Sequence, residues 1–199
     1  MKKLIALILA TLMIFALVSC GKTEDKNTDD TNNKQETDEP KADAIASPVE
    51  LLTKVWDAFG ENKFSAIGGN IENVVEDAPG EYDITMKETA MAQLVITEDG
   101  LKMVDSAASL MHMMNANTFT GAAYKLADGV KAADFIKVMQ DSVKGNNWIC
   151  GFPEKLLTAE VTDEYVVVAF GLGDIIDVFE TNLKGVYAQA KVSVENLDI

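Results

Sequence analysis

The stretch KLLTAEVTDEYVVVAF, residues 155–170, decides the fold class of this chain. Two apolar runs rich in β-branched residues, 155–161 and 165–170, flank the polar triplet Thr162-Asp163-Glu164. Strand-like runs separated by a short polar turn are typical of a β-hairpin. A helical spacing follows over 174–190, with five apolar residues on one side: Ile175, Val178, Phe179, Leu183 and Val186.

A second hairpin and helix are predicted upstream, between about 105 and 144. Residues 106–114 fit a buried strand, although residues from Leu101 to Met111 also recur at a helical spacing. We favour the strand because 118–126 has the pattern of another strand and Asn115-Ala116-Asn117 suits the turn between them. Residues 130–143 then predict a helix.

The two hairpin–helix units predict an α+β fold, with an antiparallel sheet of about four strands and helices on one face. An N-terminal helix is expected from Ser47 to Gly60, because Ser47-Pro48-Val49-Glu50 is a capping box with proline at the first helical position. Residues 62–80 suggest one or two helical turns, and 85–96 another short helix. The units share an order of elements, but too few residues match to indicate a duplication.

The N-terminus resembles a bacterial lipoprotein signal peptide. Lys2 and Lys3 precede an apolar run over 4–18, and LVSC at 17–20 resembles a lipobox. About 15 apolar residues are too few to span ~30 Å of hydrocarbon comfortably. The resemblance implies cleavage before Cys20 and lipidation of its sulfur, with the protein on the extracytoplasmic face of the cell membrane. A Gram-positive surface and a periplasm both remain open.

The composition divides the chain into three parts. Residues 1–19 are the expected signal peptide. Residues 20–46, a lipidated cysteine and an acidic polar linker, contain too few large apolar side chains to fold, so we expect disorder there. Residues 47–199 have a suitable length for a single globular domain.

Charge excludes one class of partner. Residues 47–199 contain 24 acidic residues and 11 lysines, and the whole chain has no arginine. Such a domain is repelled by phosphate backbones, so no nucleic-acid partner is expected. Missing arginine also removes the bidentate fork that binds carboxylates and phosphates well.

The sequence contains no recognisable catalytic set. His112 is the only histidine, so any Ser-His-Asp or Cys-His hydrolase would have to use it. We find no nucleophile elbow, P-loop or C-x-x-C pair. Once Cys20 is lipidated, Cys150 has no partner for a disulfide, and its apolar neighbours favour a small buried side chain. We therefore expect no enzymatic activity and no cofactor.

MHMM at 111–114 is a weak candidate metal site. Thioether and imidazole groups suit Cu(I), so Met111, His112 and Met113 define an alternative function in copper handling. In a strand, however, Met111 and Met113 point one way and His112 the other. Packing is the simpler interpretation.

Three stretches are similar to an uncharacterised family of lipid-anchored lipoproteins from clostridia and their relatives: AASLMHMMNANTFT (107–120), WICGFPEKL (148–156) and YVVVAFG (165–171). The resemblance implies an anchored surface protein and carries no activity or functional residues. Some similar proteins bear the label bacteriocin transport accessory protein, which is an alternative. We expect a non-catalytic domain that binds a protein, peptide or cell-wall ligand.

Overall fold

A central antiparallel sheet organises residues 44–198, which the computed structural model describes. The helices are α1 (Pro48–Asp57), α2 (Lys87–Gln93), α3 (Glu98–Leu101), α4 (Ala132–Lys144) and α5 (Gly173–Val186), with a 3-10 turn at Gly60–Asn62. The strands are β1 (Ala66–Gly68), β2 (Val75–Glu76), β3 (Gly80–Tyr82), β4 (Val104–His112), β5 (Phe119–Leu126), β6 (Lys155–Glu160), β7 (Tyr165–Gly171) and β8 (Lys191–Asn196).

The predicted α+β class and antiparallel sheet are confirmed, but the predicted number of strands is wrong. The described sheet has eight strands in the order β2-β1-β4-β5-β7-β6-β8, with β3 also pairing with β4. The four strands predicted from the two hairpins, β4, β5, β6 and β7, form its centre. The strands that the sequence did not predict are β8 at one edge of the sheet and β1, β2 and β3 at the other.

Residues 62–80 form strands and not the helical turns that were expected. β1 and β3 both pair with β4, and their backbones approach each other closely. A Cβ atom on Gly68 would lie only 2.2 Å from the backbone nitrogen of Gly80. Glycine at position 68 therefore permits a backbone contact that any side chain would prevent. This contact depends on residues 12 positions apart, so local spacing did not reveal it.

The last helix is shorter than predicted and gives way to β8. α5 ends at Val186, whereas the helical spacing predicted an end near 190. Lys191–Asn196 has only two apolar side chains, Val192 and Val194, and both pack on the sheet face that α5 covers. The sequence of β8 has little strand propensity of its own, so the strand is stabilised mainly by pairing with β6 along its whole length.

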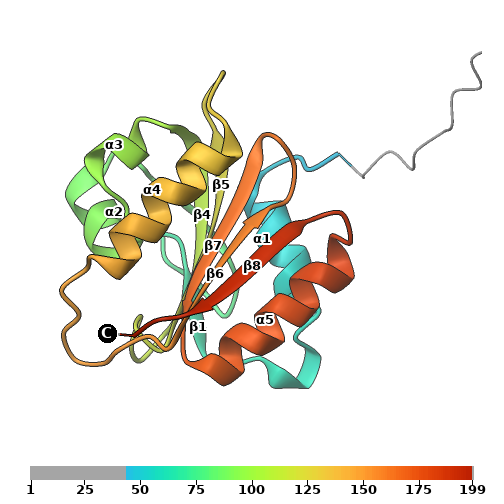
Figure 1. Ribbon diagram of the computed structural model, residues 1–199. Coiled ribbons are helices and arrows are strands. Elements are labelled where there is room, and N and C mark those ends of the chain that lie inside the picture. Colours follow the sequence, from blue (N-terminus) through green and yellow to red (C-terminus); the bar gives the residue numbers. More distant parts are fainter. Residues whose placement is uncertain (1–43, 199) are drawn as a thin grey trace, which may run out of the picture. The chain divides into compact units, whose positions relative to one another are not determined.

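The helices cover both faces of the sheet, so the prediction that they lie on one face is wrong. Val166, Val168 and Phe170 of β7 belong to one apolar cluster, and Val167 and Ala169 belong to the other. Figure 1 shows α2, α3 and α4 on one side of the sheet and α1 and α5 on the other. β7 is buried at every position, as expected for a strand between two helical layers. Since α4 and α5 lie on opposite faces, the two hairpin–helix units do not repeat one arrangement.

α1 begins where the capping sequence placed it. Ser47 Oγ accepts a hydrogen bond from the Glu50 backbone N–H at 3.1 Å, and Pro48 occupies the first turn. Leu51, Leu52 and Val55 are buried in the cluster that this helix shares with α5. No helix within residues 44–198 has the length and apolar character needed to cross a membrane.

Candidate functional site

Three loops meet at the end of the sheet where β4 finishes and β5 begins. The β4–β5 turn lies there, and so does the connection from α4 to β6, because Lys155 of β6 and Phe119 of β5 are both aligned with Gly171 of β7. The β7–α5 connection also starts there. The Leu172 N–H donates to the Thr118 carbonyl at 2.9 Å, which joins this connection to the β4–β5 turn.

Two asparagine side chains hold the α4–β6 loop against the β4–β5 turn. Asn115 Nδ2 donates to the Cys150 carbonyl at 2.9 Å. Asn117 Nδ2 donates to the carbonyls of Ile149 and Gly151, at 2.9 and 3.0 Å. Loop backbone groups need such partners because no strand supplies them. The asparagines predicted as turn residues thus also fix a loop more than 30 positions away in the sequence.

Large apolar side chains are exposed on these joined loops, and we call them the apolar rim. Its members and their exposed fractions are Met113 (44%), Met114 (82%), Ile149 (69%), Phe152 (61%) and Leu172 (39%). Single exposed apolar residues are ordinary on protein surfaces. Five on three hydrogen-bonded loops are the kind of grouping that marks interaction surfaces.

The sequence around four of the five rim residues lacks charge, although the protein is strongly acidic. No Asp, Glu, Lys or Arg occurs in 106–124 or in 145–153, whereas a quarter of the whole chain is charged. Depletion of charged residues with enrichment of methionine and aromatic residues characterises the centres of protein interfaces. Methionine also adapts its shape to different partners.

The α4–β6 loop is strained at its centre and anchored at its start. Cys150 has a φ of 63°, a left-handed conformation that is uncommon for a residue with a side chain. Trp148 is buried, and its ring lies edge-on to that of Phe170 with centroids 5.2 Å apart. The expectation that Cys150 is a small buried residue is wrong, because its thiol is exposed. Strained positions of this kind concentrate at functional sites.

The candidate copper ligands are divided between environments. Met111 is buried, whereas Met113 is exposed in the apolar rim. His112 stacks on Phe64 with ring centroids 5.3 Å apart, and its Nδ1 accepts a bond from the Met114 N–H at 3.3 Å. Met111 and His112 are neighbours on β4, so their side chains point to opposite faces of the sheet. The strand therefore does not bring this pair to one ion.

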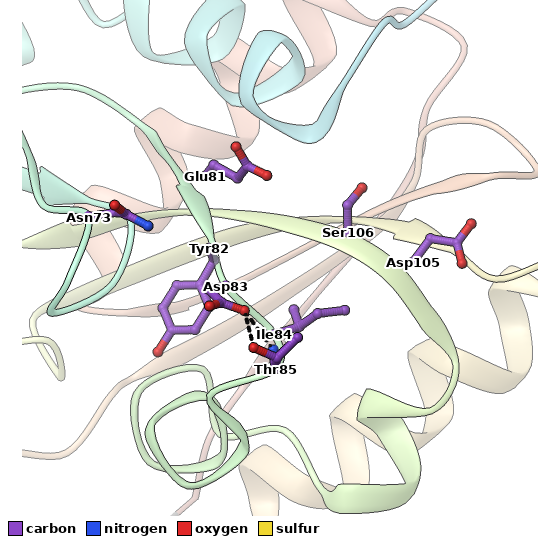
Figure 2. Close-up of a pocket in the computed structure, with 8 residues that line it drawn as sticks. All are labelled: Asn73, Glu81, Tyr82, Asp83, Ile84, Thr85, Asp105 and Ser106. Atoms are coloured by element: carbon purple, nitrogen blue, oxygen red, sulfur yellow. Dashed lines mark hydrogen bonds between the residues drawn. The ribbon is translucent and has the colours of Figure 1, made fainter.

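A notch of about 370 Å³ opens at the other end of β4, on its outer edge (Figure 2). β3 pairs with β4 only at residues 107–109, so the edge at Val104–Ser106 has no strand partner within the described chain. The β4–β5 register shifts between Val104 and Ser106, which makes Asp105 the extra residue of a β-bulge. The notch is lined by Asn73, Glu81, Tyr82, Asp83, Ile84, Thr85, Asp105 and Ser106.

The carboxylates of the notch do not converge. Asp83 accepts hydrogen bonds from the Thr85 hydroxyl and N–H at 2.6 and 2.9 Å, and these bonds lower the pKa of the Asp83 carboxyl. Figure 2 shows Glu81 and Asp105 apart from that pair. Across residues 44–198 there is no group of three or more His, Cys, Asp or Glu side chains placed to hold a metal ion.

The sequence alone does not indicate the apolar rim, because its members belong to separate loops. In the sequence, Met113 is a candidate only as a metal ligand, and Ile149 and Phe152 stand out only as neighbours of Cys150. The absence of charge in both loops was the signal that could have joined them. Cys20, the predicted lipidation site, lies outside the described residues.

No protein-family model, curated protein or solved structure matches this chain. Its function is therefore inferred from its own residues.

Proposed function

We propose that this protein is an extracytoplasmic, lipid-anchored lipoprotein whose domain is non-catalytic and binds a partner protein through the apolar rim. The lipobox-like LVSC at 17–20 supports the anchor, with Cys20 as the lipidated residue. Two or more acyl chains hold a protein stably on a bilayer, whereas one is marginal. The polar segment that follows serves as a spacer between membrane and domain.

The observation that carries the binding function is the apolar rim on pre-arranged loops. Asn115 and Asn117 fix the loop backbone before any partner arrives, so binding costs little ordering entropy. Phe152, Ile149 and Met114 each expose more than half of their surface, which provides anchor side chains for a complementary pocket. Residues 106–124 and 145–153, which carry four of the five rim residues, contain no charged side chain, so water can be removed from them without leaving a charge unpaired.

The position of the rim favours a protein over the membrane as its partner. β7 begins at Tyr165, where Glu50 of α1 is close enough to influence the pKa of the tyrosine hydroxyl. The rim lies where β7 ends, at the opposite end of the sheet from the start of the described chain (Figure 1). The spacer thus joins the domain away from the rim, and the rim stays accessible on an anchored protein.

The test compares two triple variants of the full chain, expressed in its own host and captured from membranes with surface and secreted proteins present. Met114→Ser, Ile149→Ser and Phe152→Ser together remove the rim. Ile71→Ser, Val74→Ser and Met91→Ser together remove three other exposed apolar side chains, from the β1–β2 connection and α2. We expect the rim variant to capture at least tenfold less of a partner protein than the unaltered chain, because each removed anchor contributes roughly 1 kcal/mol or more to binding.

The control variant should retain that protein at the level of the unaltered chain. Equal capture by both variants would contradict the proposal. Loss of binding to zwitterionic lipid vesicles by the rim variant alone, with protein capture unchanged, would assign the rim to the membrane and overturn it as well.

A further inference from the structure

The strands at the two edges of the sheet differ in length and regularity. At the β2 edge the strands are two or three residues long, and Asp77 beyond β2 has a φ of 52°, which turns the chain away from an extended path. At the other edge β8 is a regular six-residue strand that pairs with β6 over its whole length. β8 has no proline and no bulge, two of the devices that prevent a sheet from adding strands, and its charged residues Lys191 and Glu195 have opposite signs.

The pairing of β8 with β6 determines which backbone groups of β8 point away from the sheet. The Leu197 N–H donates to the Glu154 carbonyl, so the backbone groups of Leu197 point towards β6. Alternate residues of a strand point their backbone groups to the same side, so those of residues 191, 193 and 195 also point towards β6. Those of Val192 and Val194 therefore point outward. Among residues 44–198 no strand lies beyond β8 to receive them.

The charge pattern of β8 selects one way of pairing the strand with itself. Outward residues must face outward residues, so Val192 can lie opposite Val194 of a second copy. In that antiparallel register Ser193 lies opposite Ser193, and Lys191 lies opposite Glu195 of the second copy. Shifting the register by two residues in either direction removes both Lys–Glu pairs. Opposite charges that face each other across strands stabilise pairing, whereas like charges oppose it.

We propose that two copies of this chain associate through β8, in the antiparallel register that is centred on Ser193 and extends the sheet across both molecules. The pairing stops naturally at its ends, because the Ala190 N–H already donates to the Tyr187 carbonyl. α4 and α5 pack mainly on β6 and β7, so no helix of residues 44–198 covers the outer edge of β8.

Neighbouring ion pairs are arranged to extend across this interface. Lys191 Nζ lies 2.7 Å from Glu160 Oε1, and Lys144 Nζ lies 2.6 Å from Glu195 Oε2. Placing Lys191 of the second copy opposite Glu195 joins the two pairs into one alternating network, Glu160–Lys191–Glu195–Lys144, on each side of the two-fold axis.

Thiol cross-linking in isolated membranes tests the register, with the full chain expressed in its own host. Ser193→Cys in a Cys150→Ser background places two thiols opposite each other at a non-hydrogen-bonded pair, where cross-strand Cα atoms are about 4.5 Å apart and a disulfide fits. Mild oxidation with copper phenanthroline should give a reductant-sensitive band of twice the mass. Cys150→Ser alone measures any background from Cys20.

Gln189→Cys in the same background is the matched control, since Gln189 is exposed but precedes β8. We expect the Ser193→Cys band to exceed the Gln189→Cys band at least tenfold. Adding Val194→Pro removes an outward N–H without breaking the pairing to β6, and it should abolish the band. Cross-linking at Ser193→Cys no greater than at Gln189→Cys would overturn the proposal, as would a band that persists with Val194→Pro. Neither result depends on what the apolar rim binds.

Discussion

At the scale of single residues, two buried tyrosines on the same side of the sheet differ in how their hydroxyls are satisfied. Tyr82 Oη donates to Gln93 Oε1 at 2.6 Å. Tyr124 is fully buried beside Phe135, and its Oη has no hydrogen-bond partner among the described residues. A buried polar group without a partner costs free energy, whereas a partnered one contributes modestly.

Removing each hydroxyl should therefore change stability in opposite directions at pH 7. Tyr82→Phe is expected to lower the free energy of unfolding by about 1 kcal/mol, and Tyr124→Phe to raise it by about 1 kcal/mol. Urea unfolding followed by tryptophan fluorescence measures both. A loss of stability in Tyr124→Phe as large as in Tyr82→Phe would mean that the Tyr124 hydroxyl has a partner.

The same residues give the protein an alkaline limit. Burial raises the pKa of Tyr82 from 10.0 to about 12 and also raises the pKa of Tyr124. A pKa that is higher in the folded protein stabilises the fold fully below pH 10, and this contribution is lost as the pH rises towards 12. Between pH 9 and 12 the free energy of unfolding should fall less steeply with pH for Tyr82→Phe than for the unaltered chain.

Residue identity allowed part of the candidate site to be predicted. The asparagines at 115 and 117 were correctly placed in a turn, because short polar side chains favour it. Their bonds to the 149–151 backbone were not foreseeable, since nothing local to either segment indicates that they meet. Cys150 was expected to be buried from its apolar neighbours, but the left-handed backbone at this position turns the segment outward.

At the scale of elements, spacing identified the long helices and the central strands because each has a strong period of its own. The edge strands have no such periodic pattern of apolar residues. β2 has two residues, and β8 alternates with only two valines, so both exist through pairing with neighbours. The uniformly apolar β7 is typical of a strand buried on both faces, which the prediction of helices on one face did not take into account.

The α4–β6 loop yields a prediction at this scale. Asn117→Ala removes two hydrogen bonds to this loop, so amide hydrogen exchange at 149–152 should become roughly tenfold faster or more. Global stability should change little, because Trp148 still anchors the loop. Thr181→Ala, which removes a hydroxyl bond to the Asp177 carbonyl on α5, is the control and should leave the loop unchanged. Unaltered exchange at 149–152 in Asn117→Ala would show that the loop is held by other means.

At the scale of the whole molecule, the parts proposed to act occupy different places. The chain enters the described domain beside the start of β7, the apolar rim lies at the end of β7, and β8 forms one edge of the sheet (Figure 1). The proposed membrane attachment, partner binding and self-association would therefore use separate surfaces. Attachment also raises the local concentration of the domain, which favours weak pairing along an edge strand.

The proposed attachment through Cys20 is the premise that would place the whole domain outside the cell, and labelled palmitate tests it most directly. Cells grown with the label should yield membrane-bound protein that carries it and whose intact mass corresponds to residues 20–199 plus the attached lipid. Cys20→Ala should lose the label and remain unprocessed. Unlabelled protein in the cytosol that still begins at Met1 would contradict the account.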